Sequence, residues 1–193
     1  INDDCIGFYP VEELVASELV ASSDNYRLDR IKTIFKAVQN IPQIVITTTE
    51  GITRNVMNIE RIKNAPINLI VSHIYDREGL IKDLFIRGYK RKSLVETKGT
   101  FSVRGSVIDI FPINYDQPIR IDYFDNEIET IKVFDVNTQR SASALKQAIV
   151  FPFTEIIYKD SEVNDIINKI SMLEMPEERK ENIISKIVGR DNI

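Results

Sequence analysis

The stretch from Gly99 to Ser141, GTFSVRGSVIDIFPINYDQPIRIDYFDNEIETIKVFDVNTQRS, decides the fold expected for this chain. Apolar and polar residues alternate along three segments of it, which short polar breaks separate. A period of two is typical of strands that bury one face and expose the other. Breaks this short join antiparallel strands, because a parallel crossover needs about a dozen residues or more. We therefore expect an antiparallel sheet.

Four segments of the chain are strand candidates for this sheet. They are residues 89–96, 101–111, 119–124 and 128–134. Asp125 and Asn126 join the last two, and both residue types tolerate the left-handed conformations of a tight hairpin. A longer irregular loop is the alternative, because this pair lacks the favoured glycine.

The residues before this region follow a strand and helix rhythm. A short apolar strand, residues 6–10, precedes a helical pattern over residues 11–21. Residues 22–24 are candidate caps for a second helix. The β-branched run 44–46 predicts a buried parallel strand that leads into an amphipathic helical segment, residues 52–57.

A new unit is expected after Pro66. It starts with a strand candidate, residues 68–72, and continues with a helix that Asp76 caps and Gly88 ends. Near the end of the chain, apolar residues at helical spacing predict two helices with Pro176 between them.

These patterns predict the α/β class, with three parts: an α/β lobe, an α+β domain with an antiparallel sheet, and a helical tail that returns to the first lobe. Their expected boundaries are residues 1–65, 66–153 and 154–193. Because the chain begins without Met or a signal-like pattern, we expect the first lobe to be incomplete.

Composition excludes several classes of protein. Hydrophobic residues make up 43% and charged residues 28%, and no run approaches the roughly 20 apolar residues of a membrane helix. A single cysteine, Cys5, forms no internal disulfide, and with one histidine, His73, it cannot build a structural zinc site. A cytoplasmic protein without metal or membrane is expected. The net charge of −4 argues against a uniformly basic nucleic-acid binder.

No catalytic constellation is visible in the sequence. The phosphate-binding motif GxxxxGK[ST] is missing, and Lys98-Gly99-Thr100 lacks the upstream glycine of such a loop. The carboxylates around the predicted hairpin are typical of a solvated surface. His73 has no paired nucleophile in a known motif. We therefore expect no enzymatic activity from this chain itself.

A cluster of interface-type residues is predicted on the sheet. Alternation places Arg104 on the less buried face of its strand, opposite to Phe101 and Val107, and places Arg120 and Phe124 together on the next strand. Arginines beside an exposed aromatic are enriched at binding hot spots. The alternative is that Phe124 packs under the helix that Asp76 begins and that the arginines form internal ion pairs. Their candidate partners are Asp122, Glu127 and Glu129.

A run of basic residues offers a different function, a DNA-binding module. Its members are Arg87, Lys90, Arg91, Lys92, Lys98 and Arg104, with Tyr89 and Phe101 interleaved. Such a run can bind phosphates, but acidic residues nearby are as numerous, and a solvated face is the simpler interpretation.

The motif GTFSVRGSVIDIFP, followed by QPIRIDYFDNEIETIKVFDVNTQRS, closely resembles the second domain of the excision-repair helicase module shared by UvrB and the bacterial transcription-repair coupling factor (Mfd). Two motifs favour the coupling factor: FYPVEELVASE is similar to its YPxxExxxxE opening, and FDVNTQRS matches its FDxxTQRS ending. The resemblance covers most of residues 6–157, and UvrB itself is the alternative identity.

The resemblance implies a module that recruits UvrA, with a first lobe like that of a helicase but without its nucleotide motifs. The parent protein would displace RNA polymerase stalled at DNA lesions, using an ATP-driven translocase. ATP, magnesium, RNA polymerase and DNA would be bound by other domains. The UvrA contact would use Arg104 of the VRG motif together with Arg120 and Phe124 of the PIRIDYF motif.

Overall fold

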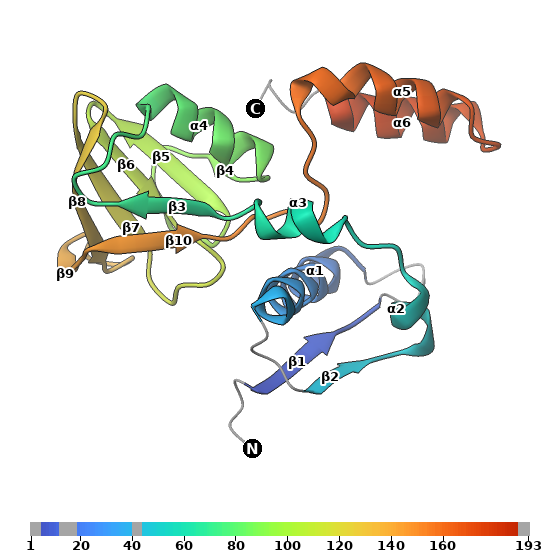
Figure 1. Cartoon of the computed structure of the whole chain (residues 1–193), viewed down its shortest axis with the longest axis horizontal. Helices are drawn as coiled ribbons and strands as arrows, with labels where there is room; N and C mark the ends of the chain where they lie inside the picture. Colours follow the sequence, from blue (N-terminus) through green and yellow to red (C-terminus); the bar gives the residue numbers. More distant parts are fainter. Residues whose placement is uncertain (1–4, 12–18, 40–43, 189–193) are drawn as a thin grey trace.

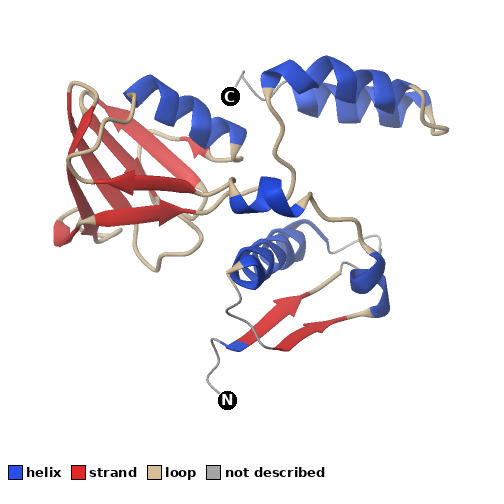
Figure 2. Ribbon diagram, viewed as in Figure 1, coloured by secondary structure: helices blue, strands red, loops and turns tan. Residues whose placement is uncertain are grey.

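Residues 5–11, 19–39 and 44–188 are described by the computed structural model of the chain. They form an α/β unit, a domain built on a large sheet, and a helical hairpin (Figure 1). Figure 2 shows in the same view that most strands lie in the middle domain. Helices and strands are mixed and the large sheet is mainly antiparallel, which confirms the expected α/β class.

The N-terminal unit contains a pair of parallel strands and three helices. Its elements are β1 (Ile6–Tyr9), α1 (Leu19–Val38), β2 (Ile44–Thr47), α2 (Thr49–Thr53) and α3 (Ile59–Lys63). β1 and β2 pair in parallel, as predicted. Phe35 of α1 and Ile62 of α3 are buried in one cluster with Phe151, whose ring centroid lies 5.1 Å from that of Phe35. The unit therefore shares apolar packing with the start of the C-terminal segment.

Three expectations for this unit are wrong. Residues 22–24 do not cap a second helix, because α1 runs through them. The helix expected over residues 52–57 begins earlier, as α2, because the Thr48 side chain caps it. β2 is not buried: Ile44–Ile46 are 45–52% exposed, since α1 packs on β1 and β2 forms the edge of a two-stranded sheet. The helix expected over residues 11–21 falls largely outside the described residues.

The middle domain is organised around a six-stranded sheet in the order β4-β5-β6-β7-β8-β9. Its strands are β4 (Lys90–Arg91), β5 (Thr100–Arg104), β6 (Val107–Ile110), β7 (Ile119–Phe124), β8 (Glu127–Phe134) and β9 (Ser141–Leu145). Neighbours from β5 to β9 are antiparallel. The predicted hairpin between β7 and β8 is confirmed, with Asp125 in the left-handed conformation at φ 53°.

The segment 101–111 is a hairpin, β5 and β6, and not the single strand that alternation predicts. Gly105 lies in its turn with φ 58°, a left-handed conformation that glycine adopts without a Cβ penalty. The chain reverses there, so Val107 stands directly opposite Arg104 and shares its face of the sheet. The expectation that Val107 shares the face of Phe101 is therefore wrong.

The sheet also differs from prediction at its two edges. Residues 89–96 supply only the short β4, which pairs with β5 in parallel because a loop over residues 92–99 carries the chain back to the same end of the sheet. The expected antiparallel pairing is wrong for this strand. At the other edge, β9 has the sequence SASAL, whose small side chains give no clear apolar alternation to predict it from.

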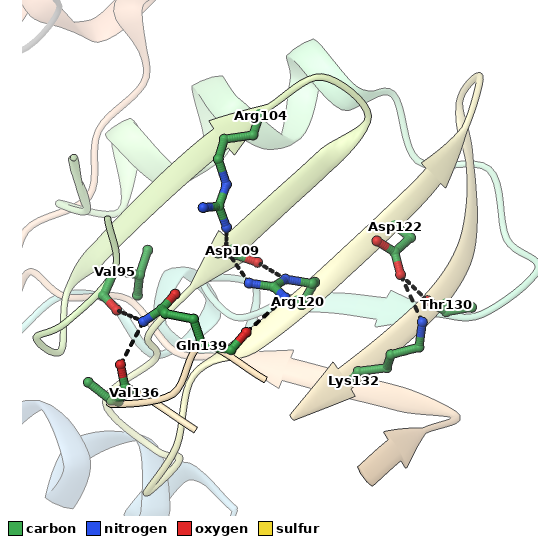
Figure 3. Close-up of polar contacts among 9 residues, drawn as sticks. All are labelled: Val95, Arg104, Asp109, Arg120, Asp122, Thr130, Lys132, Val136 and Gln139. Atoms are coloured by element: carbon green, nitrogen blue, oxygen red, sulfur yellow. Dashed lines mark hydrogen bonds and ion pairs between the residues drawn. The ribbon is translucent and has the colours of Figure 1, made fainter. Parts of the chain in front are cut away.

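One face of the sheet is covered. α4 (Arg77–Ile86) and the antiparallel pair of β3 (Ile67–Ile70) with β10 (Gln147–Val150) pack on it. Leu80 and Leu84 of α4 are fully buried in this core with Ile108 and Ile121. Asp76 caps α4 as predicted, accepting a hydrogen bond of 2.7 Å from the Gly79 amide. The opposite face carries polar side chains and, beside Arg120, a small buried cluster of Val95, Phe111 and Phe134. No described helix packs on this face, which we call the uncovered face, and α4 lies behind the sheet when it is viewed (Figure 3).

The C-terminal segment ends in the two predicted helices. Its elements are the 3₁₀ turn η2 (Asp160–Glu162), α5 (Val163–Ser171) and α6 (Glu177–Val188). The connection to them is held on α1 by Arg30, whose Nε and Nη2 donate to the two carboxylate oxygens of Glu155 at 2.8 and 3.0 Å. Among the helices described here, none is long and apolar enough to cross a membrane.

Gly99 lies in close contact with the Phe153 ring, so its replacement should affect stability. Gly99 has φ 80°, and a Cβ there would lie 2.5 Å from the Phe153 ring, whereas a Cβ at Gly105 would meet nothing within 4 Å. We expect Gly99→Ala to lower the free energy of unfolding by about 2–4 kcal/mol, and the control Gly105→Ala by only about 1–2 kcal/mol of backbone strain. Urea unfolding measures both values, and equal losses would show that the Phe153 contact is unimportant.

Candidate partner-binding surface

A buried carboxylate lies at the centre of the uncovered face of the sheet. Asp109 of β6 stands directly opposite Ser102 of β5 and Arg120 of β7, and its side chain is only 1% exposed. Directly opposite residues in an antiparallel pair project to the same side. A carboxylate removed from water needs charged or hydrogen-bonding partners. Asp109 obtains them from two arginines (Figure 3).

Arg120 binds Asp109 through two hydrogen bonds. Its Nε donates to Oδ1 at 2.7 Å and its Nη2 donates to Oδ2 at 2.9 Å, which is the bidentate geometry of a strong arginine–carboxylate pair. Nη1 donates to the Gln139 carbonyl at 3.3 Å, and the guanidinium carbon lies 4.6 Å from the Phe134 ring centroid. The hydrogen bond with Asp109 raises the pKa of Arg120 further above its ordinary value. Only 19% of this side chain is exposed, so Arg120 is ordered by the fold itself.

Arg104 reaches the same carboxylate from the other side. Its Nη2 donates to Oδ2 of Asp109, but 48% of the side chain remains exposed. The turn that follows Arg104 is held in place by Arg77 of α4, which donates to the Gly105 carbonyl at 2.8 Å. Arg104 is therefore anchored at its tip while nearly half of its side chain remains exposed to solvent.

Phe124 lies at the end of β7 on the same face as Arg120 and is 70% exposed. The alternative that it packs under α4 is wrong. Arg104 and Arg120 do form internal ion pairs, but their partner is Asp109 and none of the three carboxylates that we had considered. Recognising the Gly105 turn would have revealed it, because alternation counted from that turn places Asp109 on the face of Arg104.

A second polar group extends this face toward β8. Oδ2 of Asp122 accepts hydrogen bonds from the Thr130 hydroxyl at 2.5 Å and from Lys132 at 3.1 Å (Figure 3). Partial burial opposes ionisation of Asp122, but these two hydrogen bonds outweigh it and hold the pKa of the carboxyl below its ordinary value. The Asp122 group is therefore satisfied within the chain.

The chemistry of this face is suited to binding another protein. An exposed guanidinium can make paired hydrogen bonds with a carboxylate of another protein, and an exposed aromatic ring supplies apolar area that becomes buried on binding. In the described part of the chain, no cluster of three or more His, Cys, Asp or Glu side chains is arranged to hold a metal ion.

The basic run does not form an aromatic-lined groove. Tyr89 and Phe101 are 2% and 0% exposed, so neither ring is available to stack on a base. Arg87 binds Asp83, and Lys98 donates to the Ile113 carbonyl at 3.2 Å. Arg104 belongs to the surface just described. The other exposed members, residues 90–92, lie on the edge strand β4 and just after it, where lysine and arginine protect a sheet edge from further pairing.

Comparison with known proteins shows which family the middle domain is similar to. Residues 67–156 match the family model described as the UvrB interaction domain. This range contains α4, the whole six-stranded sheet and the face just described. Residues 67–156 are therefore similar to the UvrB interaction domain.

Two curated relatives that are similar to most of the chain are transcription-repair coupling factors. The chain is 28% identical to the transcription-repair-coupling factor of Bacillus subtilis (strain 168), over 99% of this chain and 17% of that protein. It is 32% identical to the transcription-repair-coupling factor of Staphylococcus aureus (strain bovine RF122 / ET3-1), over 82% of this chain and 13% of that protein. These matches confirm the resemblance to the transcription-repair coupling factors. The chain spans less than a fifth of the length of either relative.

Asp109 pairs with both arginines, so its replacement should also affect stability. We expect Asp109→Asn to lower the free energy of unfolding by about 3 kcal/mol, because two guanidinium groups lose the buried anion that they share. The control Asp122→Asn removes a more exposed carboxylate, and we expect a loss of about 1 kcal/mol or less. Denaturant unfolding measures both. A loss at Asp109 no larger than that at Asp122 would contradict the central place given to this carboxylate.

Proposed function

We propose that this chain is the UvrA-recruiting module of a transcription-repair coupling factor, and that UvrA docks on the uncovered face of the six-stranded sheet. The observation that carries the proposal is the grouping of Arg104, Arg120 and Phe124 on one face of a domain similar to the UvrB interaction domain. The resemblance of their motifs to the coupling factor implies the same three residues as the UvrA contact. Strand alternation reached them separately.

The three side chains have different parts in this docking. Arg104 donates hydrogen bonds to a carboxylate of UvrA through the exposed part of its guanidinium. Phe124 inserts its ring into a shallow apolar recess. Arg120 is mostly covered and binds Asp109, so it fixes the position of Arg104 through the shared carboxylate. Only the small exposed part of Arg120 contacts UvrA. A complementary UvrA surface is thus acidic next to an apolar pocket.

In this proposal the longer cytoplasmic protein performs the remaining steps. Its other domains bind ATP, magnesium, DNA and RNA polymerase, and displace the stalled polymerase. The present chain contributes neither cofactor binding nor catalysis. Its function is to recruit UvrA to the DNA lesion at which RNA polymerase has stalled.

The test is a titration of the purified chain with UvrA from the same organism. We expect Arg104→Glu and Phe124→Ala each to weaken binding by about 30-fold or more, the effect of losing about 2 kcal/mol at a hot spot. Phe124→Ala should melt like the wild type, whereas Arg104→Glu loses its bond to Asp109 and should melt somewhat lower. Circular dichroism at the titration temperature shows that both variants are folded. The matched control is Arg91→Glu, on exposed β4 of the same sheet, which should bind like the wild type. Wild-type affinity in both test variants would refute the proposal.

Arg120 needs a gentler substitution in the same titration. A glutamate there would face the buried Asp109 carboxylate and disturb folding. Arg120→Lys keeps the charge but loses the bidentate pair. We expect this variant to melt lower and to bind UvrA several-fold more weakly, because Arg104 loses its fixed anchor.

A further inference from the structure

An exposed isoleucine, Ile74, lies beside the proposed docking face, and none of the motifs in the sequence includes it. Ile74 is 82% exposed, and Phe124 is 70% exposed. Exposed apolar side chains that occur singly are ordinary, but two large ones placed together on an ordered backbone mark an interaction site. The question is whether Ile74 and Phe124 belong to one surface.

The backbone register places them in one row. Ile74 stands opposite Glu127 in an antiparallel bridge, and Glu127 stands opposite Phe124 at the end of the β7–β8 hairpin. Directly opposite residues project to the same side, with Cβ atoms about 5 Å apart. Ile74, Glu127 and Phe124 therefore cross the end of the sheet on the face that carries Arg104 and Arg120.

The segment that carries Ile74 is held firmly on both sides. The Tyr75 amide donates to the Asn126 carbonyl at 2.9 Å, and the Ile128 amide donates to the His73 carbonyl at 3.1 Å. Immediately after this segment, Asp76 caps α4 and Arg77 binds the carbonyl of Gly105 next to Arg104. The position of Ile74 is thus fixed relative to both turns of the docking face, and its exposure does not come from a loose loop.

We infer that Ile74 is a second apolar anchor of the UvrA-docking face, extending it from the β7–β8 hairpin to the segment before α4. The inference rests on the proposed function. It assigns to UvrA a recess wide enough for two apolar side chains, with a basic group facing Glu127 between them and carboxylates facing Arg104. The apolar row fixes the orientation of UvrA on the sheet, because it lies at only one end of the face.

The experiment compares two isoleucines of similar exposure. Ile74→Ser removes the proposed anchor, and Ile52→Ser changes an isoleucine that is 77% exposed on α2 in the N-terminal unit. In titrations with purified UvrA, we expect Ile74→Ser to weaken binding about tenfold, as for a moderate hot spot, and Ile52→Ser to leave it unchanged. Ile74→Met retains the apolar area and should bind within about twofold of the wild type.

The outcomes separate this inference from the proposed function. Loss of binding in Arg104→Glu and Phe124→Ala with wild-type affinity in Ile74→Ser would overturn the anchor and leave the function standing. Wild-type affinity in all three would overturn both. Melting curves establish that Ile74→Ser is folded, and if it is not, Ile74→Gln is titrated instead and must show the same loss. Equal weakening in Ile52→Ser would also overturn the inference, since the effect would not be specific to this face.

Discussion

The pairing of one buried carboxylate with two arginines organises the uncovered face of this domain. Asp109 is 1% exposed in the middle of the sheet, where an unpaired carboxylate would be strongly unfavourable. Arg120 satisfies it with a bidentate pair, and Arg104 adds a third hydrogen bond from the neighbouring strand. Replacing such a group by apolar residues is often neutral for stability. Its value here is that it fixes two guanidinium groups on a surface.

This arrangement prepares the face for binding. Immobilising a flexible side chain on association costs about 0.5–1.5 kcal/mol, and an arginine that is already held loses less. Arg104 is anchored at its tip while nearly half of it is exposed, and Phe124 and Ile74 are carried by a hairpin and a bridged segment. An antiparallel sheet can leave one face open because α4 and the β3–β10 pair cover the other. The core therefore supports the surface without occupying it.

Much of this could be predicted from the sequence. The β7–β8 hairpin, the parallel β1–β2 pair, the Asp76 cap and the position of Phe124 on the same face of β7 as Arg120 all follow from local patterns. One of the failures depends on a single left-handed glycine. Without knowing that Gly105 reverses the chain, alternation continues through it and misplaces every later residue of the segment.

Other features depend on contacts that no local pattern records. Ile74 lies in one row with Phe124 only because its segment bridges Glu127, a residue far along the chain. β4 pairs with β5 in parallel because the loop over residues 92–99 returns the chain to the same end of the sheet. β9 has too few apolar residues for alternation to predict a strand there. Periodicity predicts which side a residue faces, but the register between distant segments decides which residues become neighbours.

The most direct test of docking at this face is site-specific photo-crosslinking to UvrA. Benzoylphenylalanine in place of Phe124 keeps an aromatic group at the proposed contact, and the same amino acid in place of Ile52 probes an equally exposed position in the N-terminal unit. On illumination with purified UvrA, docking at the sheet face predicts a crosslinked product from position 124 and none from position 52. A product from position 52 with none from position 124 would contradict it.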